Sequence, residues 1–493
     1  MPKSSPAAHD NPNRAGALSF SYYKIAFRHF RDDETENALN KLIHSFRRVY
    51  NTQAALDSIM DKCMAKLRAQ EYSVYLSILV SGTKVAAGSC TLATAMMKEL
   101  VKEHMPRAIL LSPSALSAAA TATVLRCIGD CACIMGKELE PLLIDVLFPV
   151  LERLGDEDAS VKRAAGATLK RFAHYCGHEN VVSLLRGNAD YVLDALLRRL
   201  AKLRLFPSSP RVVKAVMERL EFFDDVTGKL LSELSRAVLA SLARQGSRGG
   251  NVLELLRVVL VLVTRHPVTC SVGMTQDEGP DAFAAWLAGS TFEPLLYDDE
   301  RDDDASAEEG ENAESNAVKD LDDLAMEACA YVSHPDWFVQ NVALEIVRHA
   351  LMRVPYKKVL NLLHRLWPAL CARIHQSDGI RTNAALFASL LHTIIIGMGV
   401  SGDFLSHRMG ALMPAISKQI QLFSQSLATP RNVSLLENAL ACVVVAQRLC
   451  PSSIVGSAAA ELHSRASSVR SSAPSQLARS HAQCIADALK QIA

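Results

Sequence analysis

The sequence predicts an all-α protein, a HEAT/armadillo-type α-solenoid of stacked antiparallel helix pairs, from three observations. Hydrophobic residues make up 49% of the 493 residues but aromatic residues only 6%, which favours a core of leucine, alanine and valine. Apolar residues recur three and four positions apart rather than in alternation, which is the period of a helix. Glycine and proline, at 23 and 19, are few for this length. About seven to nine helix pairs, none able to bury its apolar stripe alone, would account for the chain.

The clearest helix pair spans residues 141–177. Its first helix contains Pro149, which we expect to bend it. A glycine followed by three acidic residues at 155–158 predicts a tight turn, and small residues in the second helix predict close packing between the two helices. The two apolar stripes consist of Leu142, Leu143, Val146, Leu147, Val150, Leu151 and Leu154, and of Val161, Ala164, Ala165, Gly166, Leu169 and Phe172.

An N-terminal array of such helices is predicted for residues 18–296, after a disordered arm at residues 1–17. The arm has no apolar signal core, although its basic residues leave a transit peptide open. Ser112 is the predicted N-cap, followed by Pro113, of an alanine-rich helix that reaches Met135. Further predicted elements are three helices within 18–69, helices at 72–80 and 92–102, a helix pair at 188–220 with its turn at 206–210, and helices at 229–244 and 252–264.

Residues 297–317 predict an acidic disordered loop or linker, because this segment is almost wholly acidic and small. Ser306 precedes two glutamates, at positions 308 and 309, and is a possible site for an acidophilic kinase. A phosphorylated segment of this kind could dock on a basic cluster. We favour the simpler interpretation, a solvated insertion on one face of the solenoid.

A C-terminal array is predicted for residues 318–493. One helix–turn–helix segment places Val339, Ala343 and Ile346 on a single stripe, and the next places Pro368 inside a helix as Pro149 is placed. Helices at 404–423, 433–449 and 476–492 are predicted to complete this array.

The charge balance gives the chain no overall field for polyanions, since 53 basic and 52 acidic residues leave a net charge of +1. The local exception is a cluster of basic residues, Arg198, Arg199, Lys202 and Arg204, near the end of one predicted helix. This cluster could meet an acidic partner, although we favour its role as a solvated helix C-terminus. We therefore expect no binding of nucleic acid.

The twelve cysteines are scattered through apolar segments, which favours reduced thiols in an intracellular protein over a disulfide framework. Cys127, Cys131 and Cys133 form the one cluster, without histidines at zinc-finger spacing, so we expect buried thiols rather than a metal site. No apolar run reaches the roughly 18–20 residues that span a bilayer, and we expect a soluble protein without membrane contact.

Catalytic motifs are missing, and we expect no enzyme and no cofactor. The sequence contains no phosphate-binding glycine loop, HExxH or GxSxG pattern. Its histidines at 364, 375, 392 and 407 fall on different predicted helices, each without a nearby nucleophile. An active site assembled from distant helices would not be visible in the sequence.

Four segments, in order, resemble the Tel-two-interacting protein one family. Residues 187–219 resemble that family's Asp-Tyr helix pair, and residues 148–169 its Pro-Leu-Leu-Glu-Lys-Leu-Gly-Asp repeat. Leu366–Ala369 and Gly402–Leu405 are similar to two later landmarks. Family members are much longer and carry these landmarks in their C-terminal half, so we expect a truncated, divergent or incomplete chain that corresponds to that half.

The resemblance implies a non-catalytic scaffold subunit of a Triple-T (TTT) co-chaperone complex. Its implied partners are Tel-two-like and second Tel-two-interacting-like subunits and phosphatidylinositol-kinase-related kinases of the mTOR, ATM and ATR types, with chaperone machinery bound indirectly. It implies a cytoplasmic location, with the nucleus left open. Trp367 and Arg381 are candidate partner-binding anchors, although Trp367 could equally lie in the core. The alternative is another HEAT-repeat adaptor, such as a nuclear transport receptor or a phosphatase scaffold.

Overall fold

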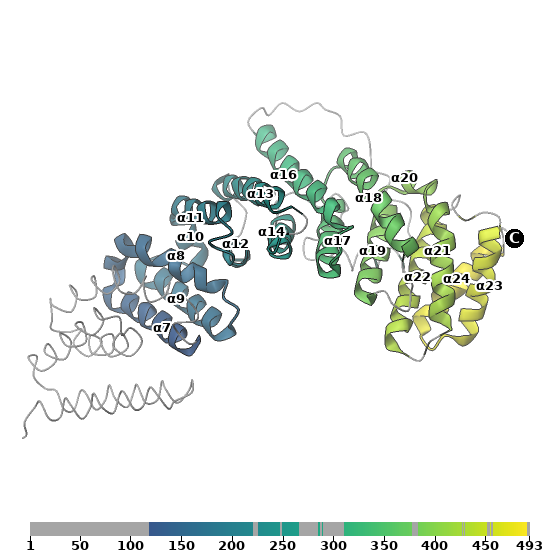
Figure 1. Ribbon diagram of the computed structural model, residues 1–493, viewed down its shortest axis with the longest axis horizontal. Helices are drawn as coiled ribbons and strands as arrows, with labels where there is room; N and C mark the ends of the chain where they lie inside the picture. Colours follow the sequence, from purple (N-terminus) through teal and green to yellow (C-terminus); the bar gives the residue numbers. More distant parts are fainter. Residues whose placement is uncertain are drawn as a thin grey trace, which may run out of the picture. The chain divides into compact units, whose positions relative to one another are not determined.

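The computed structural model describes residues 118–219, 225–246, 249–265, 310–376, 383–425, 429–450 and 457–490, with isolated positions at 284–285, 288, 427 and 454. The chain forms two compact units, Met1–Leu220 and Glu221–Ala493. Every regular element in the described residues is a helix (Figure 1). The predicted fold class is confirmed: the protein is an all-α solenoid.

The first unit, where described, contains six α-helices and one 3-10 helix. α7 (Ala118–Met135) and α8 (Leu143–Leu154) both pack on α9 (Ala159–Cys176), while α11 (Ala189–Ala201) and α12 (Ser209–Met217) pack on α8. The 3-10 helix η2 (Gly136–Leu142) leads into α8, and the short α10 (Val181–Gly187) connects α9 with α11.

The predicted pair at 141–177 is present as α8 and α9. The apolar stripe of α9 is buried throughout, and that of α8 is buried except for Leu142, which is half-buried at the end of η2. Pro149 lies inside α8 and is buried. A Cβ atom on Gly155, in the turn between these helices, would lie 2.8 Å from the backbone nitrogen of Val212. The turn can therefore approach α12 this closely only because residue 155 has no side chain.

The ends of α9 have side-chain and backbone caps. The Asp158 carboxylate accepts hydrogen bonds from the backbone nitrogens of Ser160 and Val161 at 2.7 and 3.3 Å, which satisfies two free donors of the first turn. Gly177 ends the helix with a φ of 87°, in the left-handed region that favours glycine. The backbone nitrogen of His178 then donates to the Ala173 carbonyl oxygen at 2.8 Å.

The second unit stacks its helices in two layers. One layer contains, in order of packing, α13 (Asp225–Gln245), α16 (Gly310–Tyr331), α18 (Tyr356–Gln376), α21 (Met409–Ser424) and α23 (Ser457–Ser472). The other contains α14 (Val252–Arg265), α17 (Trp337–Leu351), α19 (Ala384–Val400), α22 (Pro430–Leu449) and α24 (Gln476–Leu489). Each helix also packs on its partner in the other layer, which is the helix-pair stacking of a solenoid.

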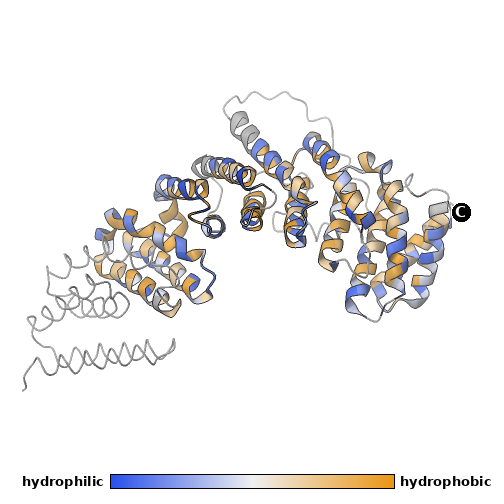
Figure 2. Cartoon of the chain, viewed as in Figure 1, coloured by the Kyte–Doolittle hydropathy of each residue, from blue (hydrophilic) through white to orange (hydrophobic). Residues whose placement is uncertain are grey.

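Burial in the second unit follows this layering. α19 is apolar around most of its circumference (Figure 2) and is buried between α17 and α22. A helix that is hydrophobic on all sides is stable in water only in such an interior position. The predicted stripe of Val339, Ala343 and Ile346 is buried in α17, and Pro368 lies within α18 as predicted.

Three elements differ from the prediction. The predicted helix at 404–423 is divided into α20 (Gly402–Ser406) and α21; at the junction the Arg408 guanidinium donates to the Phe404 carbonyl oxygen and lies over its ring. α10 and α23 were not predicted. α10 has its own cap, since the Asn180 side chain accepts from the Ser183 backbone nitrogen at 2.8 Å. The buried positions of α23 are Ala459, Leu462, Ala466 and Val469, a stripe in which only two residues are strongly apolar among many serines.

The acidic segment predicted as a loop at residues 297–317 is partly helical. Helix α16 begins at Gly310, so residues 310–317 are helical where a loop was predicted. Extending a helix from its packed part at Val318 onward costs far less than starting a new one. Residues 297–309, and all elements predicted within 1–117, lie outside the described residues. The predicted arrays at 18–296 and 318–493 do not coincide with the two units and stay a prediction. Among the described helices, none is long and apolar enough to cross a membrane.

Candidate interaction surface

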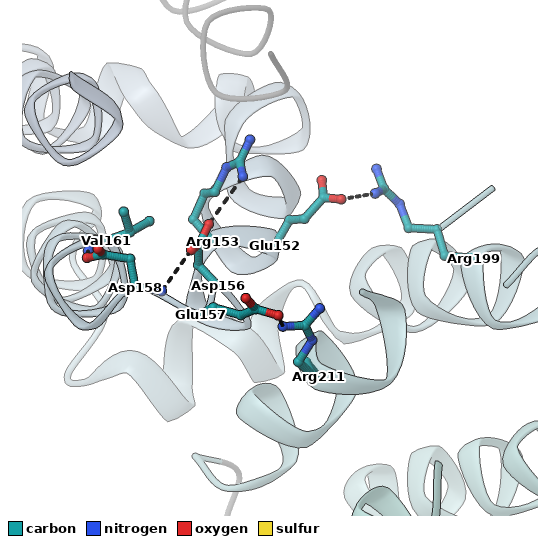
Figure 3. Close-up of polar contacts among 8 residues, drawn as sticks. All are labelled: Glu152, Arg153, Asp156, Glu157, Asp158, Val161, Arg199 and Arg211. Carbon is teal, nitrogen blue, oxygen red and sulfur yellow. Dashed lines mark hydrogen bonds and ion pairs between the residues drawn. The ribbon is translucent and has the colours of Figure 1, made fainter. Parts of the chain in front are cut away.

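The acidic turn between α8 and α9 is held by its own hydrogen bonds (Figure 3). The Arg153 guanidinium lies 3.3 Å from the Asp156 carboxylate, which also accepts from the backbone nitrogen of Asp158 at 3.0 Å. The pKa of Asp158 is lowered, chiefly by the hydrogen bond from the Ser160 hydroxyl. The turn is therefore a fixed, negatively charged feature of the first unit.

Two arginines from the following helices bind this part of the pair (Figure 3). Arg211, in α12, forms an ion pair with Glu157 of the turn. Arg199, in α11, forms an ion pair with Glu152 of α8, with 2.7 Å between the charged atoms. These contacts join α11 and α12 to α8 within the first unit.

Arg199 lies inside the fold rather than on its surface. Its guanidinium carbon is 4.3 Å from the ring centre of Phe148 and 4.8 Å from that of Phe206. Only 21% of its side chain is exposed, and 19% of its partner Glu152. An arginine whose guanidinium lies against two aromatic rings and pairs with a carboxylate is engaged within the chain rather than presented to a partner.

The other predicted basic residues lie on the surface. Arg198 is 76% exposed and pairs with Asp194 on the same helix, 2.6 Å away. Lys202 and Arg204 are exposed where α11 ends. Next to them is Leu205, 71% exposed, which the sequence reasoning missed. We call Arg198, Lys202, Arg204 and Leu205 the basic corner. The sequence signal that could have indicated its exposure is the position of this leucine, between a basic residue and the turn that begins with Phe206 and Pro207.

The remaining predicted partner-binding residues are not part of this corner. Trp367 is half-buried in α18, between the buried Leu366 and the exposed Pro368, in the second unit. Arg381 and the possible phosphosite Ser306 lie outside the described residues. Binding of a partner by any of the predicted residues stays a prediction.

Several cysteines and histidines of the described residues are buried or packed against other side chains. Burial raises the pKa of Cys176 to about 11 and of Cys329 and Cys442 to about 12, so these thiols stay protonated at neutral pH. His364 and His375 both lie in α18, not on different helices as predicted. His364 contacts the Phe404 ring edge to face, and His392 lies 3.0 Å from the Asn438 side-chain oxygen. No group of three or more potential metal ligands is gathered within the described part of the chain.

Two protein-family models match the chain. One, described as TELO2-interacting protein 1, matches residues 147–239, which include most of α8 and all of α9 to α12. The other, described as the TTI1 C-terminal TPR domain, matches residues 291–435.

Two curated relatives carry the same family description. The TELO2-interacting protein 1 homolog of Mus musculus is 26% identical over 318 residues, which cover 57% of this chain and 29% of the mouse protein. The homolog of Homo sapiens is 26% identical over 153 residues, covering 31% of this chain and 14% of the human protein. The matched part thus spans less than a third of either relative.

Among solved structures, the chain is similar to Kap121p bound to Pho4p, with 12% sequence identity and a TM-score of 0.37. That alignment covers 98% of this chain and 55% of Kap121p. It is also similar to importin beta, with a TM-score of 0.36, covering 96% of this chain and 60% of that one. Superpositions at this level do not separate one helical repeat protein from another.

Proposed function

We propose that this chain, two segments of which match models of the TELO2-interacting protein 1 family, is a non-catalytic scaffold subunit of a TTT-like co-chaperone complex. It would bind a TELO2-like subunit and a second TELO2-interacting-like subunit. Through them it would support the maturation and stability of phosphatidylinositol-kinase-related kinases of the mTOR, ATM and ATR types. Chaperone machinery would be engaged indirectly.

The observation that carries this proposal is the ordered match of two models of one family. The first covers helices of the first unit, and the second covers α16 to α21 and the start of α22 in the second unit. The relatives at 26% identity carry the same description in two mammals. The scaffold role is thus supported by two separate segments of the chain rather than by a general helical-repeat pattern.

The mechanism we propose is geometric. Stacked helix pairs hold the backbone of their exposed residues at fixed spacing. A partner therefore meets a preorganised surface, and little entropy is lost by the scaffold on binding. The caps of α9 and the arginine ion pairs around its acidic turn are such fixed elements. Binding energy in interfaces of this kind is concentrated in a few anchoring side chains.

A catalytic role has little support from the described residues. The family and the solenoid fold are typical of non-catalytic scaffolds, and the buried thiols are held protonated. A net charge of +1 provides no general attraction for nucleic acid. We propose a cytoplasmic location, with the nucleus left open, because co-chaperone action on newly made kinases takes place in the cytoplasm.

The test is affinity purification of the tagged chain from cells of its source organism, followed by mass spectrometry. The proposal predicts recovery of a TELO2 homologue and of the kinases. It also predicts that depletion of the chain lowers the abundance of these kinases while their transcripts are unchanged. Recovery of a Ran-type GTPase with cargo, or of phosphatase catalytic subunits, in place of those partners would contradict the proposal and favour the other HEAT-repeat adaptors.

A further inference from the structure

We propose that the basic corner (Arg198, Lys202, Arg204 and Leu205) is a docking point for an acidic segment of a partner protein that carries an apolar side chain. The inference rests on the proposed function in one respect, namely that the chain works by binding proteins. It adds a location on the first unit and a chemical class for what binds there.

Leu205 is strongly exposed to solvent. Four large hydrophobic residues are exposed in the described part of the chain, and Leu205 has the largest exposed fraction, 71%, against 57% for Ile144, 52% for Leu477 and 50% for Phe338. A single exposed leucine is common on protein surfaces. Leu205 differs from such a leucine because it lies in a hydrogen-bonded turn beside two exposed basic residues.

The backbone on both sides of Leu205 is fixed. The Lys202 carbonyl oxygen accepts hydrogen bonds from the backbone nitrogens of Leu205 and Phe206, at 2.9 and 3.1 Å. The Phe206 ring lies against the Arg199 guanidinium, and the Phe206 carbonyl oxygen accepts from the Ser209 hydroxyl at 2.8 Å. Because the backbone of this turn is already fixed, it loses little conformational entropy when a partner binds Leu205.

The charged residues nearest to Leu205 in the chain, Lys202 and Arg204, are both positive. Lys202 and Arg204 are exposed, and no ion pair joins either of them to a carboxylate among the residues that the structure describes. Arg198 pairs with Asp194, in an exposed contact of the kind that stabilises little and exchanges readily. Basic residues at a helix C-terminus interact favourably with the negative end of the helix dipole. This stabilising role does not require an adjacent exposed leucine.

The occupant that fits is therefore a protein segment with carboxylates for Lys202 and Arg204 and an apolar side chain for Leu205. Charge complementarity would guide the encounter, and contact with Leu205 would slow dissociation. Nucleic acid fits less well, because it offers phosphates but would leave the leucine without a specific contact, and it prefers a broader basic surface.

The test measures binding of a fluorescent peptide, with leucines interspersed among glutamates, to the full-length chain by anisotropy. The two variants are Leu205→Ser and the double variant Lys202→Glu with Arg204→Glu. Each should weaken peptide binding by about tenfold or more, as expected for an anchor residue. The matched control is Leu477→Ser with Arg479→Glu on α24, also an exposed leucine beside an exposed arginine, which should leave binding unchanged.

The result that would overturn the proposal is no binding to the wild-type chain, or equal affinity for wild type and both variants. Equal binding of a peptide with serines in place of leucines, or equal displacement by single-stranded DNA, would also overturn it. Hydrogen exchange of α11 and α12 verifies that the variants are folded. Recovery of the TELO2 homologue is measured separately: its loss with intact Leu205-dependent peptide binding would refute the proposed function alone.

Discussion

At the residue scale, neighbouring arginines in α11 have opposite roles. Arg198 lies in solvent, whereas Arg199 lies between Phe148 and Phe206 and pairs with Glu152. The sequence predicted the basic cluster but not this division. Which arginine points inward depends on how α11 packs on α8 and on the turn that brings Phe206 back, and neither is a local property of the sequence.

Arg199→Ala should destabilise the first unit by about 2 kcal/mol, because it leaves the largely buried Glu152 carboxylate without its partner. Arg198→Ala should change stability by less than about 0.5 kcal/mol, as surface substitutions usually do. Hydrogen exchange of the α8 and α11 amides measures both opening free energies. Equal effects of the two substitutions would contradict the internal role of Arg199.

Gly155→Ala should also destabilise the first unit, by about 1–3 kcal/mol. The added Cβ would lie 2.8 Å from the Val212 nitrogen and 3.0 Å from the Arg211 carbonyl carbon, and both are backbone atoms that cannot rotate away. Gly250→Ala is the control, since a Cβ there meets nothing within 4 Å. Faster amide exchange at the start of α12 in Gly155→Ala, with Gly250→Ala unchanged in α14, is the expected result.

At the element scale, the sequence was most informative where apolar stripes were strong and turns carried capping residues. The α8–α9 pair, with its acidic turn and Asp158 cap, follows from local patterns alone. The division between α20 and α21 does not, since no proline or glycine lies at the 407–408 junction, where the Arg408 side chain folds back onto Phe404. α23 was missed because its buried face has only two strongly apolar residues, Leu462 and Val469, among alanines and serines.

Asp158→Ala should loosen the first turn of α9, which loses two backbone hydrogen bonds, whereas Asp158→Asn should preserve it because asparagine is also a good N-cap. Hydrogen exchange of residues 159–163 measures the difference. Since the fold lowers the pKa of Asp158, its stabilising effect is complete above the ordinary value of 3.8 and is lost as pH falls through the folded value. An Asn variant as loose as the Ala variant would contradict the capping role.

Helix α24 should become less stable on mild acidification because of His481. Burial lowers the pKa of His481 below its ordinary 6.5; nearby Arg448 acts in the same direction and Glu437 against it. The neutral ring is favoured in the fold, so stability is complete above pH 6.5 and falls as the pH drops toward the folded pKa. Amide protection in α24, corrected for intrinsic rates, should therefore decrease from pH 7.5 to 5.5.

The variant His481→Gln isolates this effect, because glutamine does not titrate in this range. Its α24 protection should be nearly independent of pH between those values, whatever its absolute level. If the wild type and the variant respond equally to acidification, some other group causes the loss of stability.

At the scale of the whole molecule, the fold class and the order of the family landmarks were both available from the sequence, because repeat periodicity and motif order survive without knowledge of long-range packing. The two units were not, since the boundary at Leu220 follows from which helices contact one another. Partner-binding surfaces are harder still to predict, as Leu205 illustrates: it lies in a turn that Arg199 of α11 and Ser209 of α12 anchor through Phe206.

The central claim is that this chain is a protein-binding scaffold of the TTT type. The most direct test is to mix the purified full-length chain with a purified TELO2 homologue from the same organism and measure the molar mass by size-exclusion chromatography with light scattering. The claim predicts one stable species with the summed mass of the two proteins. Two separate species at micromolar concentrations of both proteins would contradict it.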